Sequence, residues 1–298
     1  MFNNVIVGVD GRQGGREAIE LAKILSAHDG ELTLVHVYPV ESPAVRGRGA
    51  IDTRGERDRA RELLKRIRGE ADVRARVQSV GASTVGRGLH EIAEVSAADL
   101  LVIGSSRRGL LGRVLATDHT RAALNGAPCA VAVAPAGYDA TAMREVGVGY
   151  DGSPESEHAL RVARALAAEH TAKLSAFEAV AFPSYLFADA IAADDTTMRE
   201  VVDAARERVA ALAGVEPHAA YGQAAEELAL YSASMDLLVI GSRGYGPIGR
   251  LVNGSTSHEL ARTARCPLLI LTRAGRAADG DGGTPSGRQA ADATTPAA

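Results

Sequence analysis

The chain has no tryptophan, only two cysteines and few aromatic residues, which make up 4% of its 298 residues. Cys129 and Cys266 are too few and too far apart for a disulfide framework or a metal-binding knuckle. Each stands beside a proline at the start of an apolar run. We therefore expect two buried structural thiols and no metal site built on cysteine.

Long apolar runs and an excess of one charge are also lacking. No apolar stretch approaches the roughly 20 residues of a membrane-spanning helix, and the opening MFNNVIVGVDG lacks the basic start and apolar segment of a signal peptide. The formal net charge is −4, with both signs mixed throughout, while 46% of the residues are hydrophobic. We expect a globular cytoplasmic protein that binds neither nucleic acid nor membrane.

One segment of the sequence occurs twice. DLLVIGS at residues 99–105 is repeated without change at 236–242. Near the start, VIVGVDG (5–11) matches VGVGYDG (146–152). The two copies are offset by 141 residues here (146 − 5) and by 137 residues at DLLVIGS (236 − 99), and we assign this difference in length to a loop at 81–88. The chain is therefore an internal duplication.

Both halves alternate apolar runs with amphipathic segments. REAIELAKILSA (16–27) and ESEHALRVARALAAEH (155–170) carry apolar residues at spacings of three and four, which indicates helices. Nearly continuous apolar strands between such helices indicate a parallel sheet covered on both faces. The expected strands are 5–9, 32–38, 73–80, 100–104 and 129–134 in the first half, and 146–150, 174–180, 215–221, 237–241 and 267–272 in the second.

The predicted fold is α/β, with two tandem doubly wound, Rossmann-like units, each a parallel five-stranded sheet flanked by helices. The first domain is expected over residues 1–137 and the second over 143–273, with a short linker between them. The tail, 274–298, has too few large apolar residues to fold. Residues 181–195 are more apolar than a loop should be, and they are either a lid or part of an interface.

Ligands of open parallel sheets bind beyond the carboxyl ends of the strands, near the point where strand order reverses. In the second half Asp151 and Gly152 follow the first strand, Ala179 ends the second, and the glycine-rich GSRGYGPIGRLVNGSTS (241–257) follows the fourth. A carboxylate at such a place suits an amine or a ribose hydroxyl. The residues at these three places are the candidate ligand-binding residues of the second half.

The glycine-rich segment has the chemistry of a phosphate site. Glycine allows backbone amides to approach a phosphate and to curl into an anion-binding nest. The segment leads through Ser255 and Thr256 into a helix, whose amino terminus favours an anion. A glycine-rich loop alone is more often only a loop, and Asp-Gly is commonly only a turn. The coincidence of position favours a nucleotide.

At these residues the sequence resembles the universal stress protein family in its tandem form, over about residues 1–273. The family motif is glycine, two residues, glycine, nine residues, glycine, then serine or threonine. The second half matches it with Gly241, Gly244, Gly254 and Ser255. The resemblance implies a fold similar to that of the adenine nucleotide alpha hydrolases.

The resemblance also implies a stress-response protein that binds ATP, often with Mg²⁺, and has no dedicated reaction. Asp151 and Gly152 would contact adenine or ribose, and the backbone near Ala179 would hold adenine. The ribose and phosphates would be held by the glycine motif, which comprises Gly241, Ser242, Arg243, Gly244, Gly254, Ser255 and Thr256.

Assembly of the two halves is a further implication of the resemblance. Each half ends in an apolar run, 129–134 or 267–272, and an exposed last strand needs covering. In the family these strands pair between domains, so we predict that the two halves form an intramolecular pseudo-dimer. Further dimerisation of whole chains, in addition to this pseudo-dimer, is left open.

The first half departs from the motif. It keeps the first glycine as Gly104 but has Arg107, Thr117 and Asp118 at the other three motif positions. An arginine at a nest position would block the approach of the backbone, and a carboxylate within ~4 Å of a phosphate would repel it by on the order of a kcal/mol or more. We expect the first half to have lost the tight nucleotide site.

Two alternatives remain for the first half. Asp10, Val37 and Gly104 could form a weak first site, and the side chains of Arg107 and Arg108 could reach a phosphate in place of the backbone.

No catalytic or metal-binding constellation stands out in the sequence. The scattered histidines, among them His158 and His258, show no ligand spacing and are expected on solvated surfaces. Hydrolysis would require a base, and no carboxylate is evident beside the glycine segment of the second half. We expect a regulatory nucleotide-binding protein rather than an enzyme; the alternative is a slow ATPase or a nucleotidyl transferase.

Overall fold

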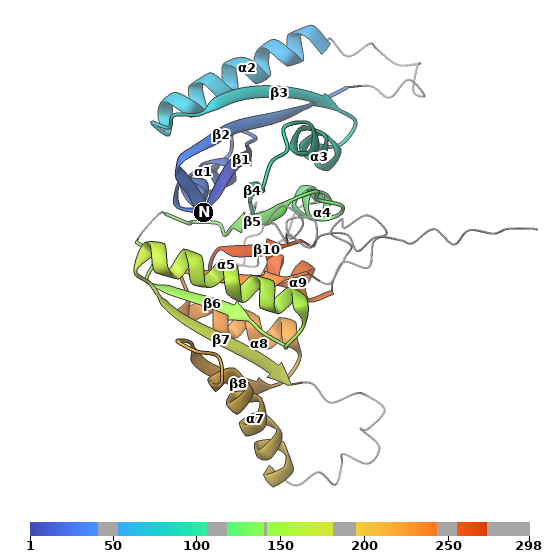
Figure 1. Ribbon diagram of the computed structural model, residues 1–298. Helices are drawn as coiled ribbons and strands as arrows, with labels where there is room; N and C mark the ends of the chain where they lie inside the picture. The colour runs from blue at the N-terminus through green and yellow to red at the C-terminus, as the bar shows by residue number, and fades with distance from the viewer. Residues whose placement is uncertain (41–52, 106–117, 140–141, 181–194, 243–254, 273–298) are drawn as a thin grey trace, which may run out of the picture.

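The apolar runs of the sequence form strands, and the segments between them form helices, in the computed structural model of the chain (Figure 1). The structure describes residues 1–40, 53–105, 118–139, 142–180, 195–242 and 255–272. The expected tail at 274–298 and almost all of segment 181–195 lie outside these residues.

All ten strands expected from the sequence are present, with bounds within three residues of the predicted ones except that β2 begins six residues earlier, at Ser26 instead of residue 32. The first half contains β1 Phe2–Gly8, β2 Ser26–Pro39, β3 Arg76–Ala82, β4 Leu100–Gly104 and β5 Ala130–Ala134. The second half contains β6 Glu145–Gly149, β7 Lys173–Val180, β8 Glu216–Tyr221, β9 Leu237–Gly241 and β10 Leu268–Leu271. The helices are α1 Gln13–Leu25, α2 Thr53–Glu70, α3 Val85–Val95, α4 Asp118–Leu124, α5 Pro154–His170, α7 Asp195–Ala210, α8 Ala224–Tyr231 and α9 Ser255–Thr263.

The strands form one ten-stranded sheet in the order β3-β2-β1-β4-β5-β10-β9-β6-β7-β8. Every pair within a half is parallel, and the same order, third-second-first-fourth-fifth, occurs in both halves. The α/β class and the parallel sheets are thus confirmed. The two expected five-stranded sheets are joined edge to edge into a single sheet.

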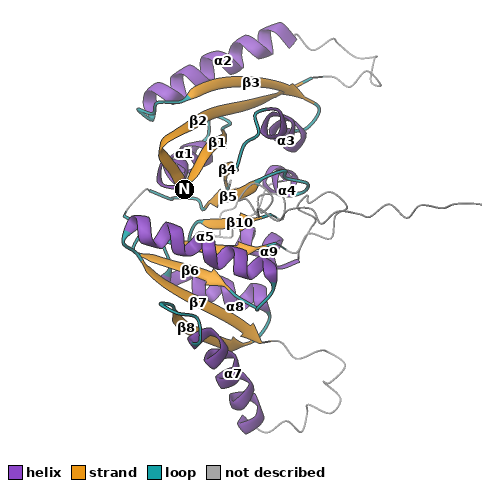
Figure 2. Cartoon of the chain, in the orientation of Figure 1, coloured by secondary structure: helices purple, strands orange, loops and turns teal. Residues whose placement is uncertain are grey.

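Helices cover both faces of this sheet (Figure 2). Alternate residues of β4 point to opposite faces, with Leu100 and Val102 in one apolar cluster and Leu101 and Ile103 in the other. The first cluster lies under α1, α2, α5 and α7, and the second under α3, α4, α8 and α9. Burial on both faces explains why the strands read as almost continuous apolar runs.

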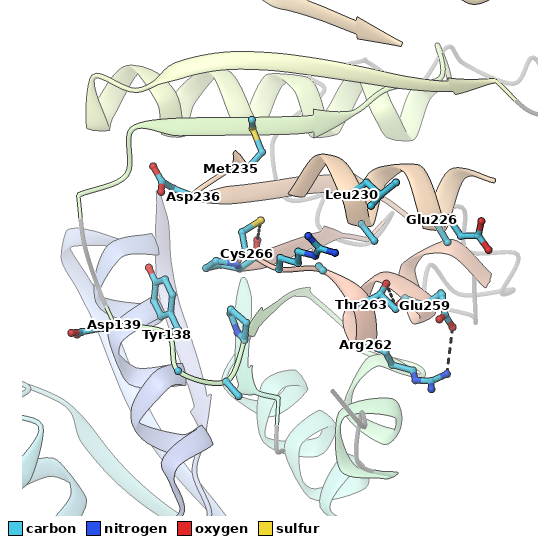
Figure 3. Close-up of a pocket in the computed structure, with 18 of the residues that line it drawn as sticks. Tyr138, Asp139, Glu226, Leu230, Met235, Asp236, Glu259, Arg262, Thr263 and Cys266 are labelled. Atoms are coloured by element: carbon cyan, nitrogen blue, oxygen red, sulfur yellow. Dashed lines mark hydrogen bonds and ion pairs between the residues drawn. The ribbon is translucent and has the colours of Figure 1, made fainter. Parts of the chain in front are cut away.

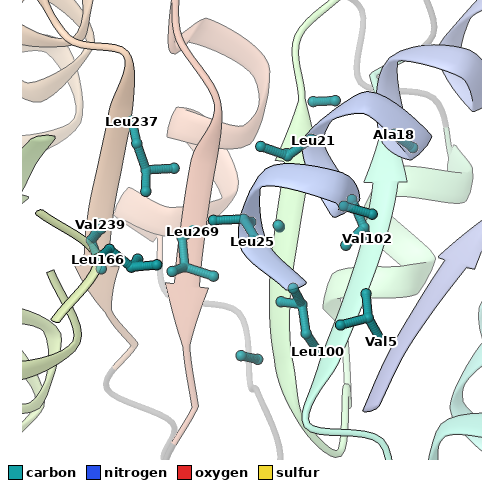
Figure 4. Packing of buried hydrophobic residues seen from close by; sticks show 14 of the residues in the cluster. Val5, Ala18, Leu21, Leu25, Leu100, Val102, Leu166, Leu237, Val239 and Leu269 are labelled. Carbon is teal, nitrogen blue, oxygen red and sulfur yellow. The ribbon is translucent and has the colours of Figure 1, made fainter. Parts of the chain in front are cut away.

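The two halves meet at β5 and β10, which pair antiparallel with Leu269 opposite Ala132. The predicted contact between residues 129–134 and 267–272 is therefore present. Both apolar clusters continue through this pairing from one half to the other. Figure 4 shows Leu25 of α1 and Leu166 of α5 in the same cluster as Leu269. The pairing leaves neither fifth strand as an open edge.

The linker between the halves is held against the first half. The backbone N–H of Gly137 donates to Oε1 of Glu17, a buried carboxylate of α1. Gly137 has a φ of +82°, a backbone conformation that favours glycine. Met143, near the end of the linker, is also buried. These contacts order the described part of the linker.

Two local predictions were wrong. The loop expected at 81–88 is shorter, because β3 continues to Ala82 and α3 begins at Val85, with the Thr84 hydroxyl accepting from the N–H of Arg87 as the helix cap. His158 was expected on a solvated surface but is 5% exposed, and its Nδ1 lies 3.2 Å from Nη2 of Arg161. His158 of α5 can be buried because the guanidinium of Arg161, one helical turn on, donates a hydrogen bond to its ring nitrogen.

Candidate functional site

The carboxyl edge of the second half brings together three of the predicted places. β6 pairs with β7 on one side and β9 on the other, all parallel, so these strands end at the same edge. Asp151 and Gly152 lie just beyond β6, Ala179 near the end of β7, and Gly241 at the end of β9. Asp151 and Gly241 are 90 positions apart in the sequence (241 − 151), and the parallel sheet makes them neighbours.

The Asp151 carboxylate is part of a turn that starts α5. Its Oδ1 accepts from the backbone N–H of Ser153 at 3.1 Å and from the Ser153 hydroxyl. Ser153 is also the helix cap, since its Oγ accepts from the N–H of Ser156 at 3.2 Å. Gly152 between them has a φ of +73°. The turn fixes the carboxylate at the strand end in an exposed position.

Gly241 is required by packing as well as by its place in the motif. A Cβ atom on Gly241 would lie 2.3 Å from the carbonyl oxygen of Glu155 in the first turn of α5. Its counterpart Gly104 is under the same constraint, since a Cβ atom there would lie 2.0 Å from the carbonyl oxygen of Gly14. The fold therefore needs this first motif glycine in both halves, whether or not a ligand binds.

Ser242 directly follows this glycine and is 3% exposed. Its backbone N–H donates to the carbonyl of Leu271 at 2.9 Å, while its Oγ has no hydrogen-bond partner among the residues that the structure describes. Ser105 in the first half is in the same condition. A buried hydroxyl without a partner is unfavourable by about 1–3 kcal/mol, so both edges contain a polar group that a ligand or a small shift could satisfy.

The amino terminus of α9 supplies backbone donors near this edge. The helix begins at Ser255 and runs for nine residues, and Thr256 lies in its first turn. The first N–H groups of a helix have no acceptor within the helix, and these groups and the helix dipole favour an anion. The remaining motif residues predicted from the sequence, Arg243, Gly244 and Gly254, lie outside the described residues, as does the side chain of Ser255.

Sequence reasoning missed a polar rim around the end of β7. Glu178, which precedes Ala179, forms an ion pair with Arg208 of α7 at 2.6 Å, and this hydrogen bond raises the pKa of Arg208. Tyr150 donates its hydroxyl to Glu157, and this bond raises the pKa of the phenol to about 12. Nothing in the local sequence signals either pair. Glu178 of β7 pairs with Arg208 of α7, and Tyr150, which directly follows β6, bonds to Glu157 of α5.

An acidic residue, Glu155, packs against the first glycine of the segment through its backbone and its Cβ atom. Glu155 is 8% exposed, and its carbonyl oxygen and Cβ are the atoms that a side chain on Gly241 would meet. The packing of α5 on the end of β9 creates this proximity. The first half has Gly14 at the corresponding position, so the carboxylate is specific to the second half.

The corresponding edge of the first half contains a hollow of about 300 Å³. Asp10, Val37 and Gly104, the residues predicted for a weak first site, all line it. Arg12 stands where Ser153 stands in the second half; its side chain caps no helix and its Nε lies 3.7 Å from Oδ2 of Asp10. The structure thus brings these three predicted residues together around one cavity.

A larger hollow of about 1200 Å³ lies elsewhere, at the amino ends of β9 and β10 (Figure 3). Tyr138 of the linker contributes to its lining, and burial raises the pKa of this phenol to about 12. Two of the four carboxylates that line it are paired: Asp236 accepts from the N–H of Arg144 at 2.7 Å, and Glu259 pairs with Arg262 at 3.4 Å. This groove is on the edge opposite the predicted nucleotide site.

The cysteines are buried and unpaired, as expected. Burial raises the pKa of Cys129 and of Cys266 to about 12, so neither forms a thiolate near neutral pH. Within the described residues, no three or more His, Cys, Asp or Glu side chains are grouped so that they could hold a metal ion. No helix in the same part of the chain is long and apolar enough to cross a membrane.

Comparison with known proteins agrees with this architecture. The model of the universal stress protein family matches the chain twice, at residues 1–135 and 143–272. The chain belongs to the universal stress protein family, with two copies of the family unit in tandem.

Individual relatives match either part of this chain or nearly all of it. A universal stress protein of Thermus aquaticus is 35% identical over 134 residues, which are 41% of this chain and 93% of that protein. A universal stress protein of Mycobacterium tuberculosis is 29% identical over 285 residues, covering 90% of this chain and 96% of the relative. The crystal structure of a universal stress protein from Archaeoglobus fulgidus, 17% identical, covers 91% of this chain and 98% of its own with a TM-score of 0.65, and this likeness supports the fold.

Proposed function

We propose that the protein is a regulatory stress-response protein that binds one ATP molecule at the carboxyl edge of its second half. The observation that carries the proposal is the convergence at one edge of the Asp151 carboxylate, the end of β7 at Ala179, and the turn at Gly241 and Ser242. The full motif of this half, through Gly244, Gly254 and Ser255, supplies the phosphate contacts in the proposal.

The described residues fit such a ligand. The buried hydroxyl of Ser242 has no hydrogen-bond partner in the part of the chain that the structure describes, and α9 begins with N–H groups that favour an anion. The Asp151 carboxylate is fixed at the strand end, where it can accept from an exocyclic amine or a ribose hydroxyl. Base and phosphates would thus be recognised by different strands of the same edge.

We expect Mg²⁺ to accompany the phosphates. No acidic cluster in the described residues could hold the ion alone, so the phosphate oxygens would be its main ligands, with a hydroxyl such as that of Ser255 or Thr256 beside them. Titration of ATP with Mg²⁺ and with EDTA tests this. Weaker binding in EDTA is expected, and equal affinities would contradict a metal-bridged phosphate site.

The binding itself is tested by mass spectrometry of the nucleotide released when the purified protein is denatured. We expect ATP or ADP in a ratio approaching one per chain. A protein from which no nucleotide is released, and to which added ATP does not bind, would contradict the proposal.

A slow ATPase is the second candidate, and Glu155 is the observation that favours it. This residue is buried and packs its carbonyl oxygen and Cβ against Gly241, and in this alternative its carboxylate would be the base that orients water. We propose binding without dedicated catalysis, so we expect no ADP formation above that of ATP in buffer. Turnover that disappears in Glu155→Gln would instead establish hydrolysis.

Cytoplasmic location and a homodimer of whole chains remain predictions from the sequence. Sedimentation of the purified chain at several concentrations would test self-association.

A further inference from the structure

The hollow of about 1200 Å³ at the amino ends of β9 and β10 lies where the two halves join, and we call it the junction groove. Residues 135–139, which follow β5, supply part of its lining, and α8 and α9 supply another part (Figure 3). Its volume exceeds the ~300–1,000 Å³ of a typical small-molecule pocket. The junction groove therefore has room for several side chains of a peptide.

Apolar side chains from different parts of the chain line the junction groove. Tyr138 and Met143 come from the linker, Met235 from the turn before β9, and Leu230 from α8. Leu230 is 58% exposed. Methionine side chains adapt to apolar partners of different shape. These residues give the groove an apolar surface that a second molecule can cover.

The free charge of the junction groove is mostly negative. Four carboxylates and two arginines line it, and two of the carboxylates are paired, one of them with Arg262. Asp139 and Glu226 have no ion pair or hydrogen bond within the residues that the structure describes. Two free carboxylates therefore stand against the single guanidinium of Arg265, and the groove favours a cation.

Two helix ends add to this negative potential. The helices α8 and α9 connect parallel strands and run back antiparallel to them, so their C-termini lie at the amino edge of the sheet. Leu230 and Thr263, from the last turns of these helices, line the junction groove. The last carbonyl groups of a helix have no donor within the helix and favour a cation. The junction groove and the proposed ATP site therefore select ligands of opposite charge.

The face of α8 that lines the junction groove has a counterpart in the first half. Leu89 of α3 and Leu228 of α8 hold the same place, because each lies 3.4 Å from a Cβ atom built on the glycine that ends the first strand of its half. This match puts three residues of α3 at the places of Glu226, Ala229 and Leu230, and they are Arg87, His90 and Glu91.

These two helix faces differ in chemistry. In the first half, Nε2 of His90 lies 2.7 Å from the carbonyl oxygen of Ala123 in α4, and the residue after this histidine is a glutamate. In the second half an alanine and an exposed leucine take these places. The fold accepts polar residues here, so it does not require the exposed apolar surface of α8. Such a surface, with charged residues around it, is typical of a contact with another molecule.

We propose that the junction groove binds a segment of a partner protein in which large apolar residues alternate with lysine or arginine. The apolar side chains of the segment lie against Leu230 and Met235, and its basic side chains lie near Asp139 and Glu226. The chain's own tail, 274–298, does not fit, because it contains no leucine, isoleucine, valine, methionine or aromatic residue. This function goes beyond ATP binding, since it uses the opposite edge of the sheet.

Fluorescence anisotropy tests the proposal on the full chain with a labelled octapeptide of alternating leucine and lysine. One matched control peptide has glutamate in place of lysine, and another has serine in place of leucine. We expect the leucine–lysine peptide to bind about tenfold or more tightly than either control. Equal binding of the three peptides, or no binding of the leucine–lysine peptide, would overturn the proposal.

The methionine methyl groups locate the bound peptide, because the chain has only four methionines. Met143 and Met235 line the junction groove, whereas Met1 begins the chain and Met198 belongs to α7. In NMR spectra of the methyl-labelled chain, we expect the peptide to shift the signals of Met143 and Met235 alone. Equal shifts of all four signals would overturn the location. Shifts of Met143 and Met235 that grow with protein concentration in the absence of peptide would overturn the partner, because a second copy would then occupy the groove.

Three variants at exposed side chains test the contacts without disturbing the core. Glu226→Arg, which copies Arg87 of the first half, should weaken the leucine–lysine peptide about tenfold and strengthen the leucine–glutamate peptide. Leu230→Ser should weaken the leucine–lysine peptide about fivefold. The control is Val95→Ser, an exposed valine at the end of α3, which should leave the affinity unchanged. Wild-type affinity in both Glu226→Arg and Leu230→Ser would overturn the proposal.

Discussion

The two halves have the same turn after their first strand, but the residue two positions after the aspartate of that turn differs in type and in role. In both, an aspartate accepts from the N–H two residues on, at 3.0 Å for Asp10 and 3.1 Å for Asp151. In the second half the residue that donates this N–H is Ser153, whose side chain also caps α5. In the first half it is Arg12, whose side chain caps no helix and pairs with Asp10. The turn belongs to the fold, and the side chain that follows it distinguishes the sites.

The glycines of the duplicated segment also fall into two classes, those that the fold requires and those that only a ligand would require. Gly104 and Gly241 are retained in both halves because the first turn of a helix packs against them. The other two motif glycines are present only in the second half, where we propose a phosphate site. A glycine that the fold needs survives duplication, and a glycine that only a ligand needs can be lost.

The largest expected effect tests whether the two halves unfold together in one transition or separately in two. Leu269 is fully buried opposite Ala132 at the junction. We expect Leu269→Ala to lower the free energy of unfolding by ~2–5 kcal/mol, because both apolar clusters cross the junction. Urea denaturation should show one transition for the whole chain.

The control is Val95→Ala, since Val95 is 80% exposed and such a change should alter stability by no more than about 0.5 kcal/mol. Two separate urea transitions, with only one of them shifted by Leu269→Ala, would show that the halves fold independently.

The next test concerns the shared glycine. Gly241→Ala and Gly104→Ala should each lower the free energy of unfolding by ~1–3 kcal/mol, because a backbone carbonyl cannot move out of the way of the new Cβ. Gly69→Ala in α2 is the control, since a Cβ atom there meets nothing within 4 Å. It should raise stability by about 0.5–1 kcal/mol. A large loss in only one half would contradict the common packing role.

The two aspartates should differ in their effect on ATP binding. Asp151→Ala should weaken ATP binding by ~1–3 kcal/mol, the usual consequence of leaving a polar partner unpaired. Asp10→Ala in the first half should leave ATP affinity unchanged within error. Isothermal titration calorimetry measures both, and a similar loss in the two variants would place ATP in both halves.

The smallest expected effect concerns the helix caps. Ser153→Ala should destabilise the chain by ~1 kcal/mol, because the N–H of Ser156 loses its acceptor. Arg12→Ser should stabilise it by about 0.5–1 kcal/mol, because it introduces a cap where none exists. Thermal denaturation of both variants provides the comparison. Destabilisation by Arg12→Ser would mean that the pair with Asp10 matters more to stability than a cap.

The strands were predictable from the sequence because burial on both faces makes them continuous apolar runs, as in β4 and β9. The contact between the last strands was predicted through the family resemblance and is present as the β5–β10 pairing. Turn residues such as Gly152 were readable because local backbone conformation restricts residue type there.

Contacts between distant elements were not predictable. The approach of Glu155 to Gly241 and the pair of Glu178 with Arg208 depend on how a helix lies on the sheet, and no local pattern records this. The cavity of the first half was missed as a cavity for the same reason. Its lining residues come from β1, α1, β2, α3, β4, α4 and the turn after β1, and the sequence indicated only Asp10, Val37 and Gly104 as neighbours.

The central claim is that the second half binds ATP and the first half does not, and calorimetric stoichiometry tests it most directly. The account predicts one ATP per wild-type chain and none in Gly244→Arg, which copies Arg107 of the first half into the second. The reverse triple change, Arg107→Gly, Thr117→Gly and Asp118→Ser, should create a second ATP site. Two equivalent ATP sites in the wild type, or one site that survives Gly244→Arg in a folded chain, would contradict the account.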